Sequence, residues 1–76
     1  MFNELETVVL THDIPDHGLR NGDVGTVVHK YADGSAFEVE FLTADGNTIA
    51  VITLVENDIR KFQPGEILHV REIASA

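Results

Sequence analysis

Residues 36–54, AFEVEFLTADGNTIAVITL, decide the fold because they encode two paired strands and the turn between them. In the first half, three apolar side chains alternate with Glu38 and Glu40, the period-two pattern of a strand with one buried face. Residues 45–46 (Asp-Gly) are a typical two-residue hairpin turn. That turn fixes the register and gives an apolar inner face, on which the predicted pairs are Phe41 with Ala50, Val39 with Ile52 and Phe37 with Leu54.

The same register defines an outer face that is partly apolar. It pairs Glu40 with Val51, Glu38 with Thr53 and Leu42 with Ile49. The hairpin before it turns at residues 33–34, and an odd-length loop there would point Val27 and Tyr31 inward and Val28 and Lys30 outward. His29 is expected on the inner side or the rim. The predicted outer face therefore carries Val28, Leu42, Ile49 and Val51, bordered by Glu38 and Glu40.

The rest of the chain repeats this strand-and-turn pattern, and no segment has a helical apolar stripe. Strands are predicted at about residues 7–11, 24–31, 36–42, 48–54 and 59–62, with a long loop after the first and a short turn at 56–58. A last apolar run, residues 67–73, follows a Pro-Gly break. We therefore predict an all-β protein: a small five-stranded SH3-like barrel with a C-terminal extra strand or tail. The single domain spans 1–76, with the barrel at about 5–62 and the tail at about 65–74.

Two resemblances agree with this fold. Residues 18–28, GLRNGDVGTVV, resemble the turn-and-strand motif of KOW-type barrels. From ELETVV at residue 4 to DIRKF at residue 62, the chain resembles an uncharacterised bacterial family of small SH3-like barrel proteins, domain of unknown function 4926. The resemblance implies the fold and supplies no catalytic residues.

Charge restricts the classes of partner. Thirteen acidic residues against five Lys and Arg give a formal charge of −8, with no basic cluster. Such a chain lacks the cations that nucleic-acid binding requires, so nucleic acid is not expected as a partner. No stretch is long and apolar enough to span a membrane, and the N-terminus does not read as a signal peptide. We expect a soluble, cytoplasmic protein whose partner is basic.

Residues 11–28 combine His12, Asp13, Asp16 and His17, which are side chains that bind metals. Pro15 disfavours a helix that would gather them, and turn formation explains the aspartates and glycines. The chain has no cysteine, and no nucleophile lies beside a base in a recognisable motif. We therefore predict no metal, no cofactor and no enzymatic activity.

The leading hypothesis is a non-catalytic protein-binding module. One version is an acidic inhibitor or immunity (antitoxin-like) protein that masks a basic partner. The predicted contact residues are Asp13, Asp16, Asp23, Val28, Glu38, Glu40, Leu42, Ile49 and Val51. Alternatives are a structural accessory subunit or a homodimer formed through the apolar fourth strand, and KOW-type nucleic-acid or ribosome binding. The outer face could instead be covered by the chain's own tail, through Leu68 and Val70 or through Ile67 and Ile73.

Overall fold

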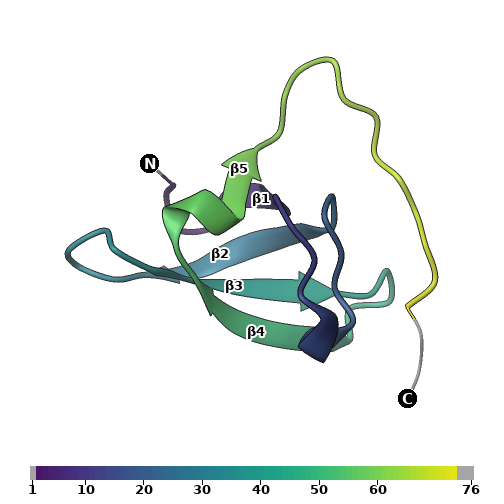
Figure 1. Ribbon diagram of the computed structural model, residues 1–76, viewed down its shortest axis with the longest axis horizontal. Coiled ribbons are helices and arrows are strands. Elements are labelled where there is room, and N and C mark those ends of the chain that lie inside the picture. Colours follow the sequence, from purple (N-terminus) through teal and green to yellow (C-terminus); the bar gives the residue numbers. More distant parts are fainter. Residues whose placement is uncertain (1, 74–76) are drawn as a thin grey trace.

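The computed structural model describes residues 2–73 and consists of one five-stranded antiparallel sheet with two short 3-10 turns (Figure 1). The strands follow the order β4-β3-β2-β1-β5 across the sheet, so β4 and β5 form its edges. The elements are β1 (Thr7–Leu10), η1 (Pro15–His17), β2 (Val24–Lys30), β3 (Phe37–Leu42), β4 (Thr48–Leu54), η2 (Glu56–Asp58) and β5 (Ile59–Lys61). The all-β prediction is confirmed, and the first and last strands pair as a small barrel-like fold requires.

The core lies on the inner face that the alternating pattern predicts. Its largest fully buried side chains are Phe37, Phe41, Leu10, Val8, Val27 and Val39. Phe2 packs edge-on against Phe37, with ring centroids 5.5 Å apart. Among residues 2–73, every buried apolar side chain belongs to residues 2–59, so the described part of the C-terminal segment adds no buried side chain to the core.

The β3–β4 hairpin has the predicted register over most of its length. Phe41 pairs with Ala50, Val39 with Ile52, Phe37 with Leu54, Glu40 with Val51 and Glu38 with Thr53. Near the turn the prediction is wrong: Leu42 pairs with Thr48, because a register shift leaves Ile49 without a partner on β3. An extra residue in one strand rotates its side chain out of the alternation. Ile49 therefore packs against the core instead of lying on the outer face.

A second register shift, in β2, places His29, Lys30 and Tyr31 on the opposite side of the sheet from the predicted one. Val27 pairs with Val39, but the register shifts at Val28, and His29 then pairs with Glu38 and Lys30 with Phe37. The predicted inward position of Tyr31 is wrong, since its hydroxyl reaches Glu38 on the outer face. His29 is exposed on that same side, and Lys30 lies at the inner-face register. A bulge exchanges the inward and outward sides for every residue beyond it. The prediction from the odd or even length of the loop at residues 33–34 does not detect such a bulge.

Gly25 is required by close packing rather than by a bend. A Cβ at this position would lie 2.7 Å from Val39 Cγ1, 2.8 Å from Phe41 Cε1 and 3.0 Å from the Glu40 carbonyl oxygen. Only glycine lets β2 cross the two core side chains at this distance. The glycine of the Gly-x-Val sequence is therefore a packing requirement of the β2–β3 pair.

The segment after β5 forms a tail and not a sixth strand. Residues 63–73 have no regular secondary structure and leave β5 in a wide arc around one side of the sheet (Figure 1). Residue 74, the predicted end of this segment, lies outside the described residues. Within residues 2–73, no helix is long and apolar enough to cross a membrane.

Candidate functional site: an acidic outer face and a tail-covered groove

The outer face of the sheet is formed by the outward side chains of β2, β3 and β4. We define it by Val28, Glu38, Glu40, Leu42 and Val51. Its three apolar members are exposed by 39–52 % of their surface, whereas the alternating residues of β3 are buried. The face therefore combines two carboxylates with apolar side chains that water reaches.

Glu38 is held in place by its neighbours on both adjacent strands. Its Oε2 accepts hydrogen bonds from the Thr53 hydroxyl at 2.6 Å and from the Tyr31 hydroxyl at 2.7 Å. Tyr31 in turn packs edge-on against His29. The bond from Thr53, followed by that from Tyr31, lowers the pKa of Glu38 below its usual value. This carboxylate is therefore oriented and ionised.

Glu40 is positioned in a similar way on the same strand. Its Oε2 accepts a hydrogen bond of 2.8 Å from the Thr48 hydroxyl. Glu38 and Glu40 are two residues apart on β3, which separates their Cα atoms by about 7 Å. Val51 lies opposite Glu40 on β4, so an apolar side chain lies directly beside this carboxylate.

The three predicted aspartates lie in the loop around η1 and at the start of β2. Asp13 Oδ1 accepts the Asn21 N–H at 2.8 Å, and Asp16 is exposed in η1. Asp23 is engaged by the tail: its Oδ1 accepts a hydrogen bond of 3.0 Å from Arg71 Nε, and Arg71 Nη2 reaches its Oδ2. Of these three predicted contact residues, Asp23 therefore lines a second region beside the tail, whereas Asp13 and Asp16 lie in the loop and belong neither to this region nor to the outer face.

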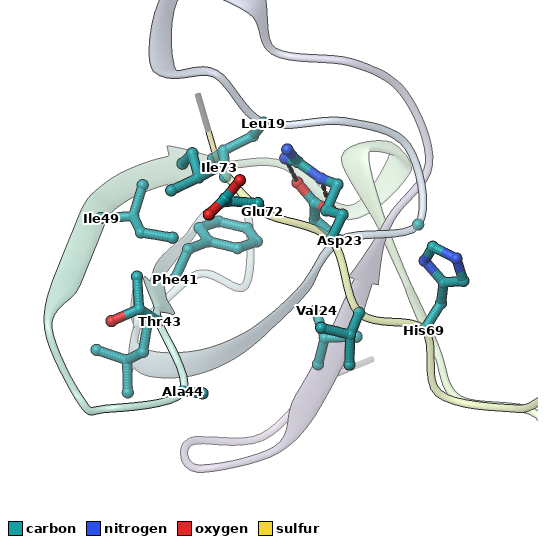
Figure 2. Close-up of a pocket in the computed structure, with 14 residues that line it drawn as sticks. Leu19, Asp23, Val24, Phe41, Thr43, Ala44, Ile49, His69, Glu72 and Ile73 are labelled. Atoms are coloured by element: carbon teal, nitrogen blue, oxygen red, sulfur yellow. Dashed lines mark hydrogen bonds and ion pairs between the residues drawn. The ribbon is translucent and has the colours of Figure 1, made fainter. Parts of the chain in front are cut away.

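That second region is a groove between the tail and one end of the sheet (Figure 2). It encloses about 460 Å³. The apolar floor is formed by Leu19, Phe41 and Ile49, with Ile73 of the tail beside them, and Arg71 and Asp23 close one side. No such hollow was expected from the sequence, because a barrel this small is filled by its own side chains.

Asp23 carries a negative charge in this groove. Its partial burial would raise the pKa, but hydrogen bonds from Arg71 and from the Arg20 N–H outweigh that effect and hold the pKa below the usual value. The hydrogen bond to Asp23, followed by the opposite charge of this carboxylate, raises the pKa of the Arg71 guanidinium. The contact is bidentate: two nitrogens of the planar guanidinium face the two oxygens of the carboxylate.

His12, the candidate metal ligand, has a structural role. Its Nε2 lies 2.7 Å from Asp58 Oδ1, and its Nδ1 lies 2.9 Å from the Asp13 carbonyl oxygen. Because both ring nitrogens face acceptors, the protonated imidazolium is favoured, and the bond to Asp58 is the main cause of the raised pKa of His12. Among residues 2–73, no three His, Cys, Asp or Glu side chains are placed to hold a metal ion.

Sequence reasoning missed Arg71, Tyr31 and Asp58. The contact from Arg71 to Asp23 crosses 48 residues, and nothing local predicts it. Tyr31 was missed because of the bulge in β2. Asp58 sits in an expected turn, where its other oxygen accepts the Val55 N–H at 2.9 Å.

Fold and site together define a small all-β domain with an acidic outer face and a separate covered groove. The family described as "Domain of unknown function (DUF4926)" matches residues 4–61, and the chain belongs to this family. The match ends where the tail begins, so the groove's floor is inside the family domain and Arg71 and Ile73 are outside it. Neither the curated proteins nor the solved structures contain a match.

Proposed function

We propose that this protein is a non-catalytic binding module whose outer face binds a basic protein. The observation that carries the proposal is the pair of oriented carboxylates, Glu38 and Glu40, set among the exposed side chains of Val28, Leu42 and Val51. Interfaces are commonly built from an apolar centre and a polar border that selects the partner. The formal charge of −8 extends the same preference over longer distances.

The mechanism would be steric and electrostatic blockade. If the partner is a nuclease or another toxin with a cationic site, the two carboxylates would take the positions of substrate phosphates and pair with Lys and Arg. In this version the protein is an inhibitor or antitoxin-like protein of the cytoplasm. The threonine and tyrosine hydroxyls that fix the carboxylates reduce the entropy lost when the pairs form.

The test is affinity capture at low salt with three tagged baits, read by quantitative mass spectrometry. The baits are the native chain, Glu38→Lys/Glu40→Lys, and Glu56→Lys/Glu72→Lys as a control with the same change in net charge. We expect one basic protein to be captured by the native chain and the control and lost from the outer-face variant. Equal capture by all three baits would contradict the proposal.

A second function is self-association through β4. This strand is an edge of the sheet, and Val51 is 52 % exposed on it. Unprotected edge strands pair readily with another chain. A native mass of two chains that becomes one chain in Val51→Lys would favour this function, and a single chain at all concentrations would exclude it.

A further inference from the structure

The tail is anchored at its start and at its far end, and between these points it makes little contact with the sheet. At the start, Arg60 donates two hydrogen bonds, of 2.8 and 2.6 Å, to the Glu66 carboxylate. Beyond it, Ile67, Leu68 and Val70 are 91 %, 70 % and 90 % exposed. Three aliphatic side chains in water are an unusual arrangement for a segment whose role is to complete a core.

Arg71 and Ile73 dock the far end of the described part of the tail. Arg71 Nη2 donates to the Gly18 carbonyl oxygen at 2.9 Å in addition to its two contacts with Asp23. Ile73 lies over Gly18, where a Cβ would be 3.9 Å from its side chain. Figure 2 shows Ile73 beside Leu19, and the ion pair at Asp23 close by. The docked element is therefore an arginine followed, two positions later, by an isoleucine.

The receiving surface is built from residues that lie outside the tail. Leu19 and Phe41 are 2 % and 1 % exposed and belong to the core, and Ile49 is turned toward them by the bulge in β4. Asp23 is oriented by the Arg20 N–H at 2.8 Å, and the Gly18 carbonyl follows η1. All of these groups lie within the residues that match the family.

We propose that this groove is a binding site for extended peptide segments that carry Arg-x-Ile or a similar arginine–aliphatic pair, and that the chain's own tail occupies it as an internal competitor. Asp23 and the Gly18 carbonyl recognise the guanidinium, and the floor of Leu19, Phe41 and Ile49 receives the aliphatic side chain. The site is separate from the outer face and does not rest on the function proposed for that face.

The charge of the groove and the covalent link of the tail both favour an arginine-containing segment as the occupant. Arginine presents several donors in one plane, and the groove offers a carboxylate and a carbonyl oxygen as acceptors. A tethered segment has an effective concentration on the order of millimolar, so two docking side chains are enough to keep the tail in place. A segment of a partner with the same pair has to displace it.

The experiment uses the full chain and a capped peptide of residues 65–73, GEILHVREI, as the probe. Arg71→Glu in the chain places two carboxylates together and releases the tail, which opens the groove. We expect the peptide to bind this variant at least tenfold more tightly than the native chain, whose tail competes at millimolar effective concentration. Chemical-shift changes in NMR spectra should lie at Leu19, Asp23 and Phe41 and not at Glu38.

The controls separate recognition from general attraction. A peptide with Glu in place of its arginine, and a peptide with Ser in place of its last isoleucine, should each bind at least tenfold more weakly. Asp23→Asn, added to the Arg71→Glu chain, keeps an acceptor for the Arg20 N–H but should lose the peptide. Ile73→Ser in the chain removes the other docking contact of the tail. This variant serves as a second chain with an open groove.

The proposal is overturned if neither open chain binds the native peptide with a Kd of about 0.1 mM or lower, which a tenfold effect of a competitor at about 1 mM requires, or if the control peptides bind equally well. A native particle of two chains that becomes one chain in Arg71→Glu would also overturn it, because the groove would then hold the tail of a second copy. Glu38→Lys/Glu40→Lys should leave peptide binding unchanged, so failure here is distinguishable from failure of the outer-face function.

Discussion

Arg71 and Asp23 form a two-point ion pair that joins the tail to the start of β2, with Arg71 Nε 3.0 Å from Asp23 Oδ1. Both side chains are about one-fifth to one-quarter exposed. The contact fixes the course of a tail in which Ile67, Leu68 and Val70 are exposed. It also neutralises one of the three aspartates that the sequence offered for partner binding.

Releasing this pair should free the tail and leave the barrel intact. In Arg71→Glu we expect heteronuclear NOE values of residues 67–73 to fall to those of a flexible segment, while residues 7–61 keep theirs. The free energy of unfolding should change by less than about 1 kcal/mol, since the pair is partly exposed and the core is complete without it. Arg71→Lys keeps the positive charge but loses the bidentate contact, so its heteronuclear NOE values should lie between those of the native chain and Arg71→Glu. A rigid tail in Arg71→Glu would contradict the contact between Arg71 and Asp23.

Gly25→Ala should destabilise the protein through overpacking. The added methyl group would meet Val39, Phe41 and the Glu40 carbonyl oxygen at 3.0 Å or less. We expect a loss of about 1–3 kcal/mol in the free energy of unfolding, measured by urea denaturation. Gly65→Ala is the matched control, because nothing lies within 4 Å of its added Cβ. Equal stability of the two variants would show that β2 does not pass the core so closely.

The His12–Asp58 contact should make stability depend on pH. The pKa of His12 is raised in the folded state, so its contribution is complete below the unfolded value of 6.5 and is lost as pH rises through the folded value. The pKa of Asp58 is lowered, so its contribution is lost as pH falls through the folded value.

We therefore expect His12→Asn to lower the Tm more at pH 5.5 than at pH 8.5. Thermal unfolding of both proteins at the two pH values measures the difference. His17→Asn, in the neighbouring η1, is the control for the loss of an imidazole from the same loop. A Tm difference that is the same at both pH values would contradict a charged pair between His12 and Asp58.

The ionisation of Glu38 should depend on its hydroxyl neighbours. Thr53→Val removes the hydrogen bond that lowers the pKa of Glu38 most, and Tyr31→Phe removes the next. Carboxyl ¹³C titration should show a raised pKa of Glu38 in both variants, with the larger change in Thr53→Val. An unchanged titration would mean that the carboxylate is not held by the two strands.

Periodicity predicted the strands and most of the β3–β4 register because each face of that hairpin has a distinct polarity. It failed at Ile49, Tyr31 and His29, since a bulge depends on local backbone geometry and leaves the apolar pattern unchanged. Glu38, Glu40 and Val51 could be placed on one face from sequence. The groove could not, because Arg71 meets Asp23 across 48 residues and no local pattern specifies such a contact.

NMR on this chain of 76 residues can show where on the sheet a basic protein binds. The labelled chain would be titrated with the purified protein that the native bait captures. We expect the shift changes to gather at Val28, Glu38, Glu40 and Val51 and to disappear in Glu38→Lys/Glu40→Lys. Changes confined to the surroundings of Asp23 and Arg71, or binding that survives the double substitution, would contradict binding at the outer face.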